Sequence, residues 1–114
     1  MGKCSFPKSE RLARRSQFDK VMRDGRRKKV DTVCTLFFIP NGLDRKRLGI
    51  IASRKIGNAV IRNRAKRKIR EVFRRIKTGI SPAMDIVVIS GKDLVSLPFC
   101  SLEEKISKTL LNVP

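Results

Sequence analysis

The chain has 114 residues, with 28 Lys or Arg against 10 Asp or Glu, so its formal net charge is +18. This length predicts a single domain over residues 1–114, and no apolar run reaches the roughly 20 residues that a membrane-spanning helix needs. Because the chain contains no His, it excludes a Ser-His-Asp triad, a Cys-His pair and a His-ligated zinc site.

The N-terminal part of the sequence predicts a flexible arm and then a short helix. Residues 1–8 are expected to form the arm. The helix is predicted to begin at Ser16, whose hydroxyl suits an N-cap, and to stop at Gly25. Phe18 and Met22 are four residues apart, so they share one face of this helix.

Three strands are predicted next. Residues 26–30 are basic and short, which favours an edge strand, whereas residues 33–39 are rich in β-branched and aromatic side chains and end at the turn residues 40–42. Residues 47–52 form the returning strand. Alternation places two sets of side chains on opposite faces of the second strand, namely Val33, Thr35, Phe37 and Ile39 on one and Cys34, Leu36 and Phe38 on the other.

The second half of the chain predicts a long helix, a buried strand and a final helix. The long helix begins near Asn58, a good N-cap, and ends before Gly79. Residues 85–90 form the strand, and Ser101 with Glu104 resembles a capping box at the start of the last helix. The order αβββαβα predicts an α+β fold, a two-layer sandwich with a mixed sheet of about four strands and three helices.

The long helix divides into an apolar and a basic face. The apolar stripe, which must pack on the sheet, contains Ile61, Ala65, Ile69, Val72 and Ile76, with Phe73 at its edge. The opposite face contains Asn63, Arg67, Arg70 and Arg74, bordered by Arg64 and Lys66. Guanidinium groups form two-pronged hydrogen bonds with phosphate oxygens. Arg54 and Lys55 precede the helix N-terminus, where free amides and the helix dipole also favour anions.

The charge distribution indicates a nucleic-acid partner. Residues 3–29 and 54–77 contain eleven basic residues each, against three and one acidic, and such an excess is expected to meet a polyanion. A charged helix face that served only solubility would contain more acidic residues than the single Glu71. This residue is predicted to pair with the neighbouring arginines. A scaffold with strands and no zinc ligands favours RNA over DNA.

The segment 54–70, RKIGNAVIRNRAKRKIR, resembles the signature of the bacterial ribonuclease P protein subunit, with the Arg-Asn-Arg core at residues 62–64. The segment 11–25, RLARRSQFDKVMRDG, resembles the first helix of that family. The resemblance implies an enzyme that removes the 5′ leader from precursor tRNA, in which a large RNA subunit is catalytic and uses Mg²⁺. It also implies the fold of domain 2 of ribosomal protein S5, and a protein that binds both the RNA subunit and the leader.

The resemblance also implies site residues. Those expected to meet the catalytic RNA are Lys55, Arg62, Asn63, Arg64 and Arg67, and charge and helical spacing add Arg54 and Arg74 to this predicted set. The leader is expected in a cleft between the first helix, the sheet and the basic helix, lined by Phe18, Met22, Cys34, Leu36, Lys66 and Arg70. Either Phe37 or Phe38 could face this cleft. Helical spacing alone favours a core position for Phe18, and only the resemblance places it in the cleft.

The chain departs from the family at two of these positions. An aromatic is common in the family where Met22 and Leu36 stand here, so we expect fewer stacked bases and more backbone electrostatics in the cleft. No residue of the protein is expected to be catalytic or to hold Mg²⁺ alone. The Asp residues are scattered over separate elements, which disfavours a protein-only nuclease, whereas a non-enzymatic RNA-binding protein of ribosomal type remains the alternative.

The cysteines and the N-terminus indicate the compartment. Cys4, Cys34 and Cys100 are odd in number and far apart, without the C-x-x-C spacing of a zinc site or the pattern of a disulfide scaffold. No secretory signal opens the chain. We therefore expect a cytoplasmic protein that has no membrane partner and is monomeric when free.

Overall fold

The computed structural model describes residues 11–12, 14–43, 45–80 and 83–111, so the predicted arm at residues 1–8 lies outside the described residues. Along the described chain the helices and strands follow the predicted order αβββαβα. They are α1 (Arg15–Asp24), β1 (Arg26–Val30), β2 (Cys34–Pro40), β3 (Arg47–Ile51), α2 (Ala59–Ile76), β4 (Met84–Ser90) and α3 (Phe99–Leu111).

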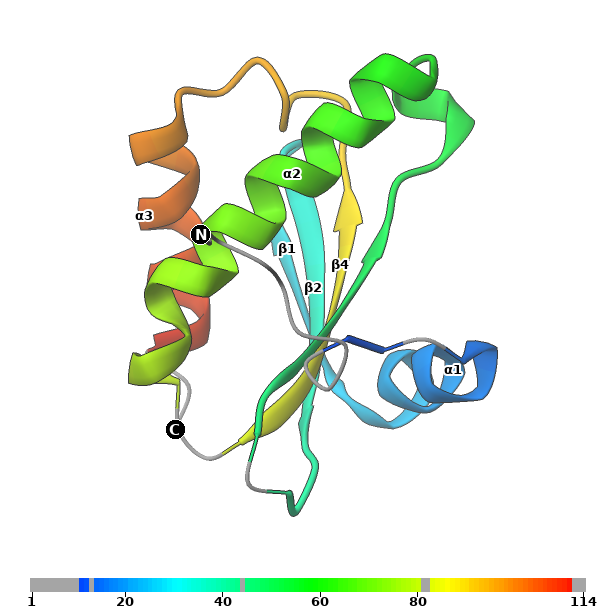
Figure 1. Cartoon of the computed structure of the whole chain (residues 1–114), viewed down its shortest axis with the longest axis vertical. Coiled ribbons are helices and arrows are strands. Elements are labelled where there is room, and N and C mark those ends of the chain that lie inside the picture. The colour runs from blue at the N-terminus through cyan, green and yellow to red at the C-terminus, as the bar shows by residue number, and fades with distance from the viewer. Residues whose placement is uncertain (1–10, 13, 44, 81–82, 112–114) are drawn as a thin grey trace, which may run out of the picture.

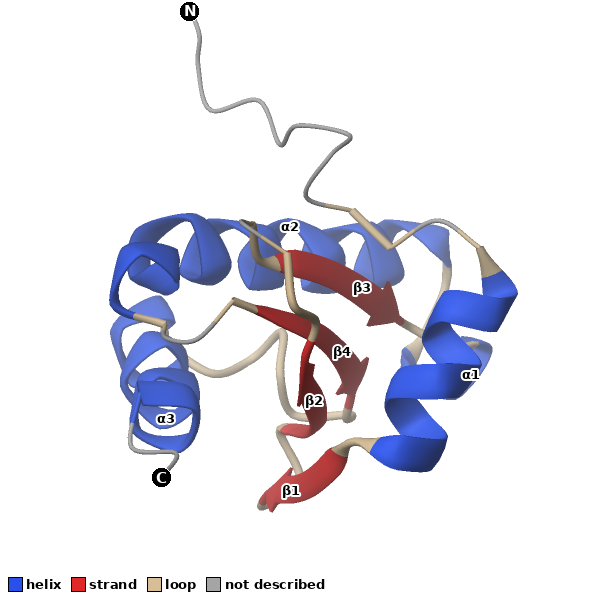
Figure 2. Cartoon of the chain, turned by 90° about the horizontal axis from the view of Figure 1, so that it is seen from below, coloured by secondary structure: helices blue, strands red, loops and turns tan. Residues whose placement is uncertain are grey.

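The four strands form one mixed sheet in the order β1-β2-β4-β3. β2 is antiparallel to both β1 and β4, whereas β3 runs parallel to β4 and is connected to it through α2. The helices α2 and α3 cover one face of the sheet, and α1 covers part of the other (Figures 1 and 2). The α+β class and the mixed sheet are confirmed, and α1 adds a partial third layer to the predicted two because both faces of the sheet are apolar.

The larger core lies between the sheet and the helices α2 and α3. The predicted apolar stripe of α2 is confirmed, since Ala65, Ile69, Val72, Phe73 and Ile76 are buried and Ile61 is half-buried. From α3 the core receives Leu102, Ile106 and Leu110. From β2 it receives Cys34, Leu36 and Phe38, as the predicted alternation requires. The prediction that Val33 shares a face with Phe37 is wrong, because Val33 lies in the turn before β2 and joins the larger core.

The smaller core lies between α1 and the opposite face of the sheet. Val21 of α1 is fully buried there against Phe37 of β2 and Val87 of β4. Phe18 and Met22 are partly buried and pack against the same cluster. Phe37 therefore faces the α1 side of the sheet, whereas Phe38 belongs to the larger core.

Two predicted helix starts are wrong. The N-cap of α1 is Arg14, whose backbone N–H donates to Oε1 of Gln17 at 3.0 Å, so Ser16 lies inside the first turn. The helix α3 begins at Phe99, before the predicted Ser101, and the Pro98 carbonyl accepts its first helical hydrogen bond, from Leu102 N at 3.0 Å. The predicted end of α1 at Gly25 and the N-cap of α2 are confirmed.

A partly buried ion pair joins β3 to β4. The Nε and Nη2 atoms of Arg47 donate to the two carboxylate oxygens of Asp85 at 2.8 and 2.7 Å, and Asn41 Nδ2 donates to Asp85 Oδ1 at 2.8 Å. Burial alone would raise the pKa of Asp85, but these hydrogen bonds and the charges of Arg47 and Lys20 outweigh it and hold the pKa below its ordinary value. The carboxylate therefore anchors the loop between β2 and β3 to the start of β4.

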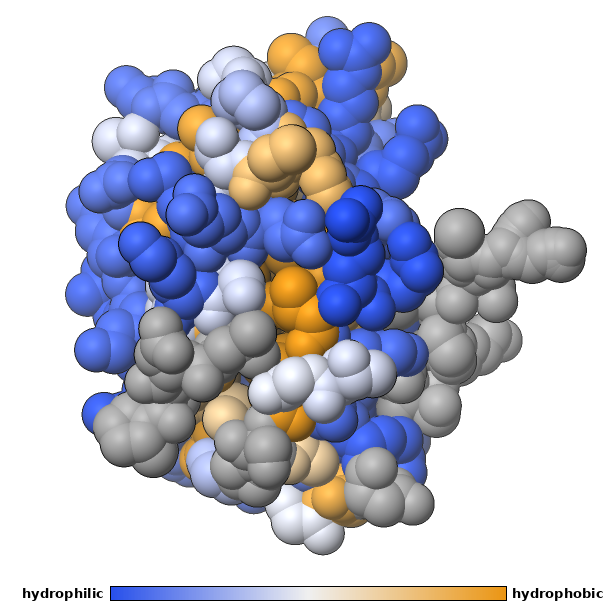
Figure 3. Space-filling view, turned by 90° about the vertical axis from the view of Figure 1, so that its left-hand side faces the viewer, coloured by the Kyte–Doolittle hydropathy of each residue, from blue (hydrophilic) through white to orange (hydrophobic). Residues whose placement is uncertain are grey.

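The surface is dominated by polar residues. On the side of the molecule shown in Figure 3, hydrophilic residues cover most of the surface, and apolar residues appear only as a broken band. Within the described part of the chain, no helix has both the length and the apolar character that crossing a membrane requires. The described fold measures 36 × 35 × 27 Å along its principal axes.

Candidate RNA interface

The outer face of α2 carries a row of exposed side chains opposite its buried stripe. Asn63, Arg64, Arg67, Arg70 and Arg74 are all exposed. Their outward direction follows from the inward direction of the apolar stripe, because both sets recur at the helical period. The helix phase predicted from the sequence is therefore confirmed.

The approach to α2 brings two further cations to its N-terminal end. Arg54 and Lys55 are exposed in a 3₁₀ turn whose first amide donor, Lys55 N, bonds Ser53 Oγ at 3.3 Å. Gly57 follows with φ at 145°, a conformation that L side chains rarely adopt. Asn58 then caps α2, its side-chain oxygen accepting from Ile61 N at 3.1 Å. Both predicted cations thus lie beside the free amides of the helix.

Not every cation of α2 is equally available. Arg74 donates from Nε and Nη2 to the carboxylate of Glu71 at 3.0 and 2.5 Å, which confirms the predicted pairing. These bonds hold the pKa of Glu71 below its ordinary value. Arg62 is half-buried, and its Nε is buried without a hydrogen bond. Arg64 and Arg67 are therefore the better placed members of the predicted RNA-binding set.

Lys68 has a structural role that the sequence did not indicate. Its Nζ donates to the backbone carbonyls of Val95 and Leu97 at 2.7 and 2.6 Å. A charged donor of this kind satisfies carbonyls that the loop after β4 leaves without secondary-structure partners. This lysine of the basic helix thus holds the loop between β4 and α3 against α2.

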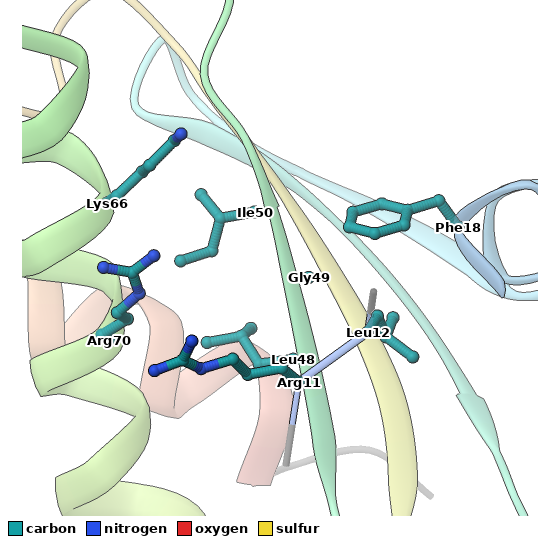
Figure 4. Close-up of a pocket in the computed structure, with 8 residues that line it drawn as sticks. All are labelled: Arg11, Leu12, Phe18, Leu48, Gly49, Ile50, Lys66 and Arg70. Carbon is teal, nitrogen blue, oxygen red and sulfur yellow. The ribbon is translucent and has the colours of Figure 1, made fainter. Parts of the chain in front are cut away.

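A groove of about 130 Å³ lies at the β3 edge of the sheet (Figure 4). Lys66 and Arg70 of α2 point into it from one side, and Arg11 approaches from the N-terminal segment. The ring of Phe18, from α1, forms the opposite wall. The remaining lining residues are Leu12, Leu48, Gly49 and Ile50. A groove with cationic groups on one wall and an aromatic ring on the other suits one strand of a nucleic acid.

The structure separates the predicted cleft residues into three groups. It brings together Phe18, Lys66 and Arg70, from three distant parts of the sequence. Met22 is half-buried against the smaller core and does not line the groove. The prediction that Cys34 and Leu36 face the cleft is wrong, because they are 2% and 0% exposed beneath α2 and α3.

The reason for this error is the strand order. β4 lies between β2 and β3, so the edge that borders the groove is β3 and not β2. The face of β2 that carries Cys34 is also covered by two helices. Burial raises the pKa of the Cys34 thiol to about 12, so this side chain is an uncharged core residue near neutral pH.

The β3 residues of the groove were missed, although one signal pointed to them. Gly49 interrupts an otherwise apolar strand, and a glycine within a strand often marks a close approach by another group. Here a Cβ at Gly49 would lie 2.5 and 2.6 Å from Cε2 and Cζ of Phe18. No comparable signal pairs Leu12 with Leu48, whose carbonyl accepts from Leu12 N at 2.9 Å.

We expect Gly49→Ala to displace the Phe18 ring and to lower the free energy of unfolding by about 1–3 kcal/mol, the usual cost of overpacking. In a Phe18→Ala background the same substitution should cost far less, because the clashing ring atoms are gone. Urea unfolding of the four proteins of this double-mutant cycle measures the coupling. Equal costs in the two backgrounds would contradict the close packing of ring and strand.

The side chains that usually bind metal ions are not clustered among the described residues. There, no three His, Cys, Asp or Glu residues form a group that could hold a metal ion. Among the described acidic residues only Asp85 is buried, and its carboxylate accepts hydrogen bonds from Arg47 and Asn41.

Fold and site together define a class, a small and strongly basic α+β domain that presents guanidinium groups along one helix and a cationic groove beside it. The sequence model described as Ribonuclease P matches residues 6–113, and the chain belongs to the ribonuclease P protein family. Members of this family are protein subunits of ribonuclease P, an endoribonuclease that acts on precursor tRNA, so the chain has an RNA partner. The family and function that the motif implied are thus confirmed.

Individual relatives are similar to this chain over nearly its whole length. The "Ribonuclease P protein component" of Desulforapulum autotrophicum is 41% identical over 112 residues, which cover 95% of this chain and 92% of that protein. The solved ribonuclease P protein of Thermotoga maritima superposes with a TM-score of 0.81 at 37% identity, covering 92% of this chain and 98% of that one. The Staphylococcus aureus protein superposes with a TM-score of 0.78 at 30% identity, over 91% and 94%.

Proposed function

We propose that this subunit binds the catalytic RNA of ribonuclease P through the outer face and N-terminal end of α2, and the 5′ leader of precursor tRNA in the groove. The observation that carries the proposal is the groove itself. It sets the ring of Phe18 opposite the cations Lys66 and Arg70, beside the exposed arginines of α2. One bound RNA strand and one RNA scaffold can therefore be held side by side.

The α2 surface suits the catalytic RNA because its contacts are with phosphate. Arg64 and Arg67 are exposed, and each guanidinium can bond two phosphate oxygens at once. Arg54 and Lys55 add charge at the helix end where free amides also favour anions. The protein supplies binding and orientation in this proposal, and the RNA supplies the catalytic groups together with the Mg²⁺ that the chemistry needs.

The groove suits a leader that is held more by charge than by stacking. Phe18 is the one aromatic side chain among the residues that line it. Met22 lies outside the groove and Leu36 is buried, so neither could stack on a base even if it were aromatic. A single stacked base contributes about 1–3 kcal/mol. We therefore propose weak dependence on leader sequence and strong dependence on salt.

We also propose that the free protein is monomeric and acts in the cytoplasm. A charge of +18 on a small chain makes copies of it repel one another, which supports the monomer. Cys34 and Cys100 are free thiols, which supports a reducing compartment.

Reconstitution tests the function. The purified protein is mixed with a bacterial ribonuclease P RNA and precursor tRNA at low Mg²⁺ and moderate salt, and release of the 5′ leader is followed. We expect efficient cleavage only with protein and RNA together. Binding without any gain in cleavage would instead support an RNA-binding protein of ribosomal type.

The role of the groove is tested separately with Phe18→Ala and two substrates. With a precursor that carries a full leader, the variant should lose the 1–3 kcal/mol of one stacked base, roughly 5- to 150-fold in affinity. With a precursor whose leader is a single nucleotide, the variant and the parent protein should bind alike. An equal loss with both substrates would show that Phe18 acts through folding and not through the leader.

A further inference from the structure

The strand β1 carries a second group of cations that neither α2 nor the groove includes. Arg26, Arg27, Lys28 and Lys29 follow one another along this strand, and all four are exposed. β1 is an edge strand that pairs with β2 alone in the sheet. It lies at the opposite end of the sheet from α2 and β3 (Figure 2).

The acids nearest to these cations in the sequence are already engaged. Asp24 pairs with Arg23 at 3.3 Å, and Asp31 pairs with Lys105 at 3.3 Å. Among the described residues, the side chains of the β1 cations form no ion pair and no hydrogen bond. Four adjacent positive charges therefore remain uncompensated at one edge of the fold, where a polyanion would relieve their mutual repulsion.

The strand geometry divides the four cations into two rows. Arg26 and Lys28 stand opposite Phe38 and Leu36, which face α2 and α3. Arg27 and Lys29 stand on the other face of the sheet, because successive residues of a strand alternate. The outer edge of β1 also leaves backbone N–H groups without strand partners, and such groups bond phosphate oxygens well.

Two rows of charge favour a double helix over a single strand as the partner. A single strand presents one row of phosphates, whereas the narrow major groove of A-form RNA brings two rows near each other. Single-strand sites also use aromatic stacking platforms, and β1, with the sequence RRKKV, has no aromatic residue and no side-chain amide for reading bases.

We propose that the β1 edge is a second RNA-binding surface, which docks between the phosphate rows of an RNA double helix without reading its sequence. With α2 at the other end of the sheet, the protein then joins two RNA segments across its width. This goes beyond the proposed function, because neither the groove nor the α2 face takes part in it.

The test is the salt dependence of binding to a short blunt-ended RNA duplex. Lys28→Gln with Lys29→Gln removes one cation from each row. The matched control, Lys92→Gln with Lys108→Gln, removes the same charge from two exposed lysines elsewhere. We expect the slope of log affinity against log salt to flatten by about 1.4–1.8 in the β1 variant, from roughly 0.7–0.9 for each lost phosphate contact. The control should keep the parent slope.

Three results would overturn the proposal. Equal flattening in both double variants would show an effect of net charge alone, and an unchanged slope in the β1 variant would show no contact. Self-association of the β1 variant in sedimentation, with unchanged duplex binding, would show that the lysines only protect an open strand edge. Arg67→Gln, measured with ribonuclease P RNA, tests the α2 face independently, so the failure of one surface is distinguishable from the failure of the other.

Discussion

Replacing Arg64 and Arg67 together by glutamine is expected to weaken binding to ribonuclease P RNA roughly 10- to 150-fold for each arginine, since a hydrogen bond to a charged group contributes about 1.5–3 kcal/mol. Both side chains are exposed on the outer face of α2, so folding should be unaffected. The dependence of log affinity on log salt should flatten by about 1.4–1.8. Filter binding over a range of salt concentrations measures both effects.

A charge-conserving pair of substitutions separates geometry from charge. Arg64→Lys with Arg67→Lys keeps both charges but loses the planar fork that bonds two oxygens. We expect this variant to keep most of the salt slope while binding more weakly than the parent protein. If the glutamine variant kept the parent slope, the outer face of α2 would not touch phosphate, and the proposed RNA interface would be wrong.

Replacing Asp85 by asparagine is expected to lower the free energy of unfolding by about 1.5–3 kcal/mol, because the partly buried Arg47 loses its hydrogen bonds to a charged partner. The side chains of this pair are only 19% and 10% exposed. Asp24→Asn is the matched control: it breaks the exposed pair with Arg23, and we expect a loss below about 1 kcal/mol. Chemical denaturation near neutral pH measures both.

The difference in the free energy of unfolding between the parent protein and Asp85→Asn should depend on pH in a defined direction. The pKa of Asp85 in the folded protein lies below its ordinary value of 3.8, so the folded state binds fewer protons than the unfolded state in this range. The stabilisation is therefore complete above that value and is lost as the pH falls through the folded pKa. At about pH 3 the free energies of unfolding of the two proteins should differ less than at neutral pH. A difference that stayed constant with pH would show that the ion pair does not stabilise the fold.

The order of the elements and the phase of α2 could be predicted from the sequence because both depend on local periodicity. Ile69 belongs to the apolar stripe of the helix and Arg67 to its basic face. Since both sets follow the helical period, Ile69 is buried and Arg67 exposed once the helix packs on the sheet. Helix starts were harder to predict. Ser101 with Glu104 has the spacing of a capping box, but α3 begins two residues earlier, at Phe99.

The sequence by itself determined that the chain folds into αβββαβα and carries a one-sided basic helix, since neighbours along the chain decide both properties. Only the tertiary structure decided that β4 separates β2 from β3. That insertion buries Cys34 and Leu36, makes β3 the wall of the groove beside Phe18, and sets the β1 cations at the far edge. Strand order joins residues that are distant along the chain, and no local spacing records which strands will be neighbours.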